Sequence, residues 1–348
     1  SAVDGYAFCF DDYKSLPKNG SLEFILNLEK MALAGREVSY EEGCRLINLP
    51  DSALFDILAS TEKVRRSFKG IEVNLCSIVN AKSGLCQEDC SFCSQSSFYN
   101  ADIKTYPMID SREIISAAAL ASRNSAREFS IVTSGTGVYD ERDIEILVDA
   151  IQGMKKDMPL ERCASLGITN KDVLLKLKDA GLESYHHNLE TSRSFFPNIC
   201  TTHDYDDDVN VIKTAKELGF YVCCGGIFGI GESREQRVEL AVTLRELDVD
   251  SVPINFLNPR PNTPLERANY LTPAECLKII ALYRFMLPKK DIVICGGRHV
   301  NLRDMQCLIF AAGANGMMIG NYLTTMGRPV EEDLNMVKNL GLKIRGFK

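Results

Sequence analysis

The chain has 348 residues, of which 45% are hydrophobic and 25% charged, a composition that suits a protein with a sizeable folded core. Its formal net charge is −7 and it has no long apolar run, so neither nucleic acid nor a membrane is expected as a partner. Thirteen cysteines in a long chain, with no signal peptide expected, indicate reduced thiols and metal sites, and therefore a cytoplasmic location.

The first part of the chain is expected to be helical. Apolar residues recur at helical spacing between about 22 and 69, for example Leu26, Leu33, Leu46 and Leu54. We therefore expect residues 1–69 to form a helical cap that precedes the main domain.

After this cap, short β-rich runs alternate with amphipathic helical stretches. Strands are expected at 71–78, 128–133, 162–166, 184–189, 221–227, 252–256, 292–296 and 316–319. Helices are expected at 112–122, 142–158, 170–180, 207–218, 234–247, 273–286 and 302–312.

This alternation predicts an α/β fold, a (β/α)8 barrel of the TIM type over residues 70–320. Functional residues in such a barrel lie at the carboxyl ends of the strands. An open, doubly wound sheet remains the alternative, because periodicity does not show whether a sheet closes. Residues 321–348 are expected to form a charged tail that packs on the barrel.

A cysteine motif directly follows the first expected strand. Cys86, Cys90 and Cys93 have the spacing C-x3-C-x2-C. Thiolates are the preferred protein ligands of iron-sulfur clusters, and this motif offers three where a cubane cluster takes four. A structural zinc site would need a closed set of four ligands, and no second pair of matching spacing follows nearby. The motif therefore predicts a cluster with one iron open to a small molecule.

Other stretches give a more specific resemblance. Together with the cysteine motif, these stretches resemble biotin synthases, a family of radical S-adenosylmethionine (SAM) enzymes, from about residue 55 to 341. They are Asn80-Ala81-Lys82-Ser83-Gly84-Leu85, Tyr185-His186-His187-Asn188-Leu189-Glu190-Thr191-Ser192, Gly225-Gly226-Ile227-Phe228-Gly229-Ile230-Gly231-Glu232, Ser251-Val252-Pro253-Ile254-Asn255-Phe256-Leu257 and Gly296-Gly297-Arg298.

The resemblance implies a reaction and its cofactors. Cys86, Cys90 and Cys93 would hold a [4Fe-4S] cluster that binds SAM and splits it to a 5′-deoxyadenosyl radical. The radical would take hydrogen from dethiobiotin, and an auxiliary cluster, [2Fe-2S] in the family, would supply the sulfur that completes biotin. A low-potential electron donor such as flavodoxin or ferredoxin, and a homodimer, are also implied.

The resemblance also implies which residues contact the small molecules. Asn188 and Glu190 would bind the SAM ribose, Phe92 would lie by the adenine, and Gly226 and Ile227 would approach SAM through the backbone. Packing of the cysteine loop is the alternative for Phe92, and tight strand packing is the alternative for the glycines. Asn255 would bind the ureido ring of dethiobiotin.

The auxiliary cluster is where the chain departs from the family. Cys163, Cys223 and Arg298 match three of the expected ligands, but Ser130 stands where a cysteine is expected. Cys224 and Cys295 are additional candidates, which predicts a relocated or larger cluster, of a 4Fe type with extra sulfide. Cys223 and Cys224 face opposite ways in a regular strand, so both bind only with a local bulge.

Other cysteines have weaker claims. Cys44, Cys76, Cys276 and Cys307 are explained by the common burial of small free cysteines, and Cys200 is less favoured as a ligand than Cys224 or Cys295. A second departure is Asp208, which stands where the family often has an arginine that pairs with the SAM carboxylate. An acid cannot form that ion pair, so another basic residue, or iron and backbone groups, must hold the carboxylate.

Two other functions remain open at this point. One is a related radical SAM enzyme, of an amino-acid mutase or cofactor-maturation type. The second is a non-catalytic iron-sulfur carrier, which would have fully ligated clusters and little use for Asn188 and Glu190.

Overall fold

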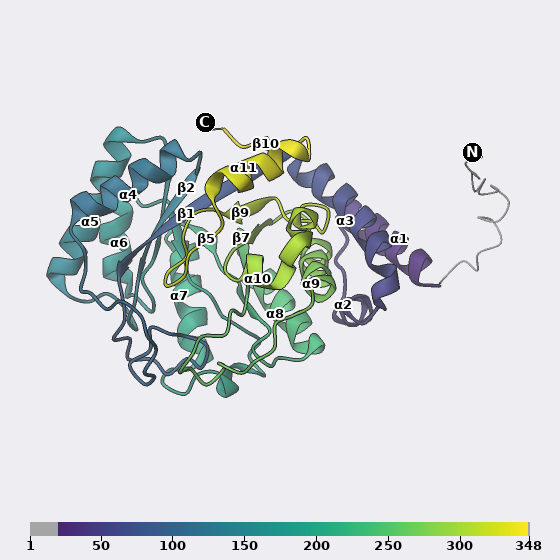
Figure 1. Ribbon diagram of the computed structural model, residues 1–348, viewed down its shortest axis with the longest axis horizontal. Helices are drawn as coiled ribbons and strands as arrows, with labels where there is room; N and C mark the ends of the chain where they lie inside the picture. The colour runs from purple at the N-terminus through teal and green to yellow at the C-terminus, as the bar shows by residue number, and fades with distance from the viewer. Residues whose placement is uncertain (1–19, 347–348) are drawn as a thin grey trace, which may run out of the picture.

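The computed structural model describes residues 20–346. Residues 1–19 of the expected cap and the last two residues of the expected tail lie outside this range. The described part of the cap consists of α1 (Gly20–Leu33), α2 (Tyr40–Ile47), a short 3-10 turn (Asp51–Ala53) and α3 (Leu54–Lys69). These helices lie beside the barrel at the purple end of the ribbon and pack on its helix α9 (Figure 1).

The rest of the described chain is built on parallel strands. They are β1 (Glu72–Lys82), β2 (Glu128–Thr133), β3 (Glu161–Ser165), β4 (Ser184–His186), β5 (Tyr221–Cys223), β6 (Gly226–Phe228), β7 (Ser251–Phe256), β8 (Asp291–Ile294) and β9 (Gly316–Met318). Neighbouring strands pair in chain order, and β9 pairs back to β1. Because β5 and β6 share one place in the ring, this is a closed eight-stranded barrel, and the predicted fold class is confirmed.

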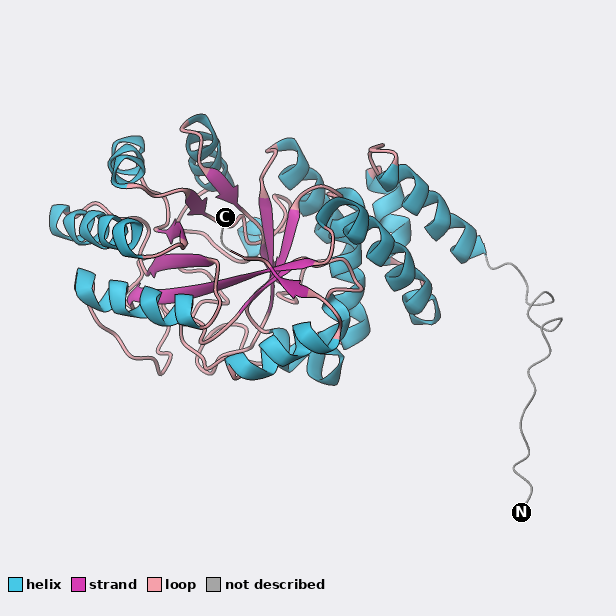
Figure 2. Cartoon of the chain, turned by 90° about the horizontal axis from the view of Figure 1, so that it is seen from above, coloured by secondary structure: helices cyan, strands magenta, loops and turns pink. Residues whose placement is uncertain are grey.

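Helices cover the outside of the barrel (Figure 2). They are α4 (Ser111–Arg123), α5 (Glu141–Asp157), α6 (Lys171–Ala180), α7 (Tyr205–Glu217), α8 (Arg234–Glu246) and α9 (Pro273–Met286). Side-chain caps explain where several of these helices begin: Asp110, Asp140 and Asn170 each accept a hydrogen bond from a first-turn backbone N–H. All six lie within two residues of the expected starts.

Several expected elements differ from the structure; the strand expected at 184–189, for example, ends at His186. The strand expected at 221–227 is interrupted at Cys224 and Gly225, where a side chain on Gly225 would collide with the Pro253 carbonyl group. The helix expected at 302–312 is instead a short helix α10 (Arg298–Leu302) followed by a 3-10 segment (Arg303–Ile309). Gly297, in the left-handed conformation, begins α10 earlier than the apolar pattern indicates.

The chain ends with α11 (Val330–Asn339) and β10 (Lys343–Ile344). Strand β10 pairs in parallel with the first residues of β1. Helix α11 and strand β10 appear in yellow at one edge of the barrel (Figure 1). Among the described residues, no helix is both long enough and apolar enough to span a membrane.

Candidate active site

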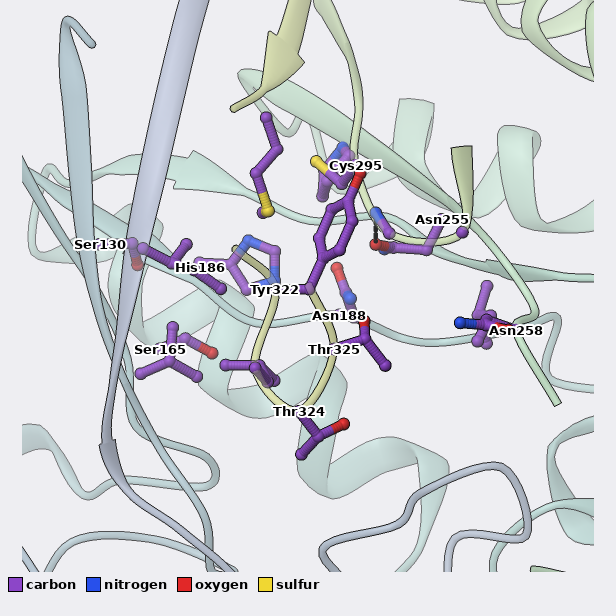
Figure 3. Close-up of a pocket in the computed structure, with 18 of the residues that line it drawn as sticks. Ser130, Ser165, His186, Asn188, Asn255, Asn258, Cys295, Tyr322, Thr324 and Thr325 are labelled. Carbon is purple, nitrogen blue, oxygen red and sulfur yellow. Dashed lines mark hydrogen bonds between the residues drawn. The ribbon is translucent and has the colours of Figure 1, made fainter. Parts of the chain in front are cut away.

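A cavity of about 330 Å³ opens among the carboxyl ends of the strands (Figure 3). Its wall takes residues from every strand of the barrel and from the loop of residues 322–325 after β9. Parallel strands bring their carboxyl ends together, so residues far apart in the sequence converge here.

The cysteine loop covers one side of this cavity. Backbone hydrogen bonds close the loop on itself: the Cys86 N–H donates to Gln95 at 3.0 Å, and the Ser97 N–H donates to Cys86 at 2.8 Å. Phe92 and Cys93 line the cavity, whereas Cys90 is half-buried behind them. Burial raises the pKa of the Cys93 thiol to about 11 in the metal-free protein.

A charged network lies beneath the loop. His203 lies between two carboxylates, with Nδ1 2.7 Å from Glu88 and Nε2 3.3 Å from Asp208. Burial by itself would lower the pKa of His203, but hydrogen bonds with Asp208, Cys200 and Glu88 raise it to about 11. Asp208 also lies 2.7 Å from His187. The Sγ atom of Cys200 lies 3.9 Å from that of Cys90 and 3.3 Å from His203 Nδ1, so the network touches the cysteine motif directly.

Four other cysteines line the same cavity: Cys76 on β1, Cys163 on β3, Cys223 on β5 and Cys295 after β8. Hydrogen bonding with Cys295 and burial both raise the pKa of Cys76, while burial, followed by the nearby Glu128 carboxylate, raises the pKa values of Cys163 and Cys223. Buried neutral thiols gathered in one place are a suitable donor set for an iron-sulfur cluster.

Polar side chains occupy the side of the cavity formed by β4. The Asn188 amide donates to both carboxylate oxygens of Glu190 at 3.3 Å, and its oxygen accepts the Gly225 N–H at 3.1 Å. Burial, partly offset by the Asn188 hydrogen bond, raises the pKa of Glu190 to about 7. Glu190 itself has a φ of 61°, a conformation that turns the chain toward β6.

Comparison with known proteins identifies the family. The radical SAM superfamily model matches residues 82–244, and the biotin and thiamin synthesis associated domain model matches residues 253–343. The biotin synthase of Geotalea daltonii is 51% identical over 322 residues, which are 92% of this chain and 98% of that protein. The chain belongs to the biotin synthase family. The biotin synthase of Pelobacter propionicus is 50% identical and covers 93% of this chain and 98% of its own length.

Solved structures show the same fold as this biotin synthase family member. Methylornithine synthase has a TM-score of 0.79 at 22% identity, and the match covers 92% of this chain and 97% of that chain. The FeFe-hydrogenase maturase of Carboxydothermus hydrogenoformans has a TM-score of 0.77 at 16% identity, covering 96% of this chain and 81% of the maturase. At these identities the likeness concerns the fold alone.

The structure brings most of the expected site residues of this biotin synthase family member to one cavity. Phe92, Cys93, Cys163, Asn188, Glu190, Cys223, Ile227, Asn255 and Cys295 line it. Gly226 packs tightly, because a side chain there would meet the Glu190 carbonyl group. Asn255 accepts the Gly296 N–H at 2.9 Å (Figure 3).

Five expected site residues do not line the cavity: Cys86, Cys90, Gly226, Cys224 and Arg298. Cys224 is fully buried in the hydrophobic core outside the barrel, where its N–H donates to Ser251 at 2.9 Å. Strand β5 ends at Cys223, and of the two neighbouring cysteines only Cys223 lines the cavity. The Arg298 guanidinium is 1% exposed and is bound by Asp333 and Gln306. The residue of β8 that faces the cavity is Val293.

Among the cavity residues to which the sequence assigns no role in the site are Cys76, Glu128, His186 and Arg260. Cys76 and Ile78 are two apart on the first strand, so strand alternation places them on one face, but it does not say which face is inside. His186 pairs directly with Cys223 in the β4–β5 register, which puts the two side chains on the same side of the sheet. No signal in the sequence marks Arg260.

Proposed function

We propose that this chain converts dethiobiotin to biotin by radical SAM chemistry. The observation that supports this best is one cavity with sulfur ligands at two places. Cys93 of the cysteine loop lies on one part of its wall, and Cys76, Cys163, Cys223 and Cys295, on or directly after the strands, lie on another. An enzyme that joins a SAM-derived radical to sulfur insertion needs both sites open to the same substrate.

Cys86, Cys90 and Cys93 would hold the [4Fe-4S] cluster. The residues fit this group, because the loop carries three free thiols and its Phe92 and Cys93 face the cavity. When bound, this cluster would supply the electron that cleaves SAM, and the auxiliary cluster would supply the sulfur atom of the product. The protein's own contribution is to orient SAM and substrate and to enclose them away from water.

The auxiliary cluster would be held by Cys76, Cys163, Cys223 and Cys295. This set replaces Cys224 of the sequence-based proposal with Cys76, because Cys76 lines the cavity and Cys224 lies outside the barrel. Four thiols can hold a cluster of the 4Fe type without an arginine ligand, which is consistent with Arg298 being engaged elsewhere.

Asn188 and Glu190 would bind the SAM ribose, Phe92 and the backbone of Gly226 and Ile227 would contact SAM, and Asn255 would bind the ureido ring of dethiobiotin. The hydroxyl groups of ribose suit an amide and a carboxylate that already share a hydrogen bond. The Asn255 oxygen accepts the Gly296 N–H, and the Asn255 amide donates one N–H to the Gly226 carbonyl group at 3.3 Å, so its second amide N–H would be the one that binds the substrate. A carboxamide N–H group matches a urea carbonyl.

The test is a single-turnover assay with anaerobically reconstituted protein, SAM, reductant and dethiobiotin. We expect biotin and 5′-deoxyadenosine from the wild-type chain and neither product from Cys93→Ala. Cys276→Ala is the matched control, because Cys276 is a fully buried cysteine of α9 that does not line the cavity. Reductive cleavage of SAM without formation of biotin would favour another radical SAM enzyme. Clusters that cleave no SAM at all would favour a non-catalytic iron-sulfur carrier.

The physiological setting is also part of the proposal. A low-potential donor such as flavodoxin or ferredoxin would reduce the cluster, and the chain would act as a homodimer in the cytoplasm. The described cysteines are all free thiols, as a reducing compartment requires.

A further inference from the structure

Arg260 is the one lysine or arginine among the described residues that line the cavity. It lies in the loop that follows β7, between Pro259 and Pro261. Its carbonyl oxygen accepts hydrogen bonds from the backbone N–H and the hydroxyl group of Thr263, at 3.3 and 2.8 Å. The two prolines and this turn restrict the backbone, so the loop holds Arg260 at the cavity wall.

The Arg260 guanidinium lacks a protein partner within residues 20–346. Its Nε atom is buried and makes no hydrogen bond. Fully buried arginines in this range have partners for their guanidinium groups: Arg65, Arg127, Arg237 and Arg298 each pair with an acid, and Arg284 donates to backbone carbonyl groups and to Asn315. Arg298 also leaves its Nε without a hydrogen bond, but its other nitrogens bind Asp333 and Gln306. A buried guanidinium nitrogen without a partner costs free energy, so its presence in a cavity wall indicates a ligand that supplies the missing acceptor.

The chemistry of that ligand follows from the guanidinium. Its planar array of N–H donors and permanent charge match a carboxylate, which accepts two parallel hydrogen bonds. Both small molecules of the proposed reaction carry one: the aliphatic carboxylate of dethiobiotin and the amino-acid carboxylate of SAM. Asp208 cannot serve either of them, since it is an acid already held by His187 and His203.

We propose that Arg260 is a binding residue for a substrate carboxylate in this cavity, an assignment that rests on the proposed function. Its loop follows the strand that carries Asn255, and Asn258 of the same loop also lines the cavity (Figure 3). The residues proposed for the SAM ribose lie instead in the segment that follows β4. This arrangement favours the carboxylate of dethiobiotin over that of SAM as the partner.

The test pairs a change in the protein with a change in the ligand. Arg260→Gln keeps a polar side chain but removes the charge, and the methyl ester of dethiobiotin removes the charge from the ligand. We expect Arg260→Gln to raise the KM for dethiobiotin about 10- to 100-fold, the range for a charge-assisted hydrogen bond. The same variant should leave the KM for the ester unchanged, and Arg260→Lys should recover much of the loss.

A second arm measures SAM. The dissociation constant of SAM, followed by the electron paramagnetic resonance signal of the reduced cluster, should stay unchanged in Arg260→Gln if dethiobiotin is the partner. A weaker SAM constant with an unchanged KM for dethiobiotin would identify the SAM carboxylate as the partner and would still support a carboxylate site. Iron content and melting temperature verify that each variant is folded.

Arg267→Gln is the matched control, because Arg267 follows in the same segment and its side chain is 93% exposed. It removes the same charge from the chain outside the cavity, so neither constant should change. If Arg260→Gln alters neither the KM for dethiobiotin nor the SAM constant, the inference is wrong although biotin formation by the wild type still stands. Absence of biotin from the wild-type reaction would instead overturn the proposed function.

Discussion

The Arg298 guanidinium and the Asp333 carboxylate form a two-point ion pair, with nitrogen–oxygen distances of 3.1 and 2.7 Å. Both side chains are 1% exposed, and the pair joins α10, at the end of β8, to α11 of the tail. The charged groups of the pair satisfy each other inside the protein, so this contact fixes the tail against the barrel.

Breaking this pair should destabilise the fold. Asp333→Asn leaves the Arg298 charge buried without its counter-ion, which typically costs about 3–5 kcal/mol. We expect a loss of that size in the free energy of unfolding, measured by denaturant titration of the metal-free protein. Glu332→Gln, at a half-exposed neighbouring acid, should lose less than about 1 kcal/mol. Equal losses in the two variants would contradict the role assigned to the buried pair.

The choice between Cys76 and Cys224 can be tested by iron content. Cys76→Ala should lose the auxiliary cluster, roughly two to four iron atoms per chain, while it keeps the SAM-binding cluster. Cys224→Ala should keep its full iron content, because its side chain packs in the hydrophobic core. Iron and sulfide quantitation with Mössbauer spectra of both variants decides the matter. The reverse pattern would restore Cys224 as the ligand.

Sequence reasoning found the barrel because strands and helices alternate with clear periods, and the cysteine motif marked the loop after the first strand. It did not find the ligand role proposed for Cys76, since a period of two gives two faces and the closed sheet decides which of them is inside. The pairing of Ser130 with Cys163, and of Cys163 with Ser184, places these residues on one inner face only once the register is known.

Two misplacements have a similar origin. The sequence predicts Arg298 to lie in the cavity, because nothing in it indicates that Asp333, 35 residues further on, is its partner. The sequence predicts Cys224 as a cluster ligand only if the strand bulges. Instead, the backbone of Gly225 lies against the Pro253 carbonyl group, and strand β5 ends at Cys223. Contacts between distant segments, rather than local patterns, decide both cases.

Binding of SAM should depend on Glu190. Its carboxylate lies against the Asn188 amide in the cavity, so Glu190→Ala removes an acceptor that the ribose hydroxyls would use. We expect the dissociation constant of SAM to rise about 10- to 100-fold. Electron paramagnetic resonance of the reduced cluster on addition of SAM measures it. Glu145→Ala, at an exposed acid of α5, should not change it.

Cys200 should tune the SAM-binding cluster. When Cys90 binds iron as a thiolate, the Cys200 thiol 3.9 Å away can donate a hydrogen bond to it, and such bonds raise the reduction potential of a cluster. Cys200→Ala is therefore expected to lower the midpoint potential, and Cys200→Ser to restore part of it. A redox titration followed by electron paramagnetic resonance measures both, with Cys276→Ala as control. An unchanged potential in Cys200→Ala would rule out the hydrogen bond.

Glu128 should make the stability of the metal-free protein depend on pH. Burial in the cavity, reinforced by the nearby Glu161, raises the pKa of Glu128 to about 7 from its ordinary value of 4.5. Between these two values the folded protein binds more protons than the unfolded chain, so the free energy of unfolding falls as the pH rises through this window. The total loss in the free energy of unfolding is at most about 3 kcal/mol, and it is complete above about pH 7.

Glu128→Gln removes this titration and should therefore stabilise the metal-free protein at pH 8 much more than at pH 4.5. The measurement is denaturant unfolding at a series of pH values, with Glu145→Gln as a control that removes an exposed acid. The difference between Glu128→Gln and the wild type should grow between pH 4.5 and 7 and then level off. A difference that is independent of pH would mean that Glu128 is equally charged in the folded and unfolded chain.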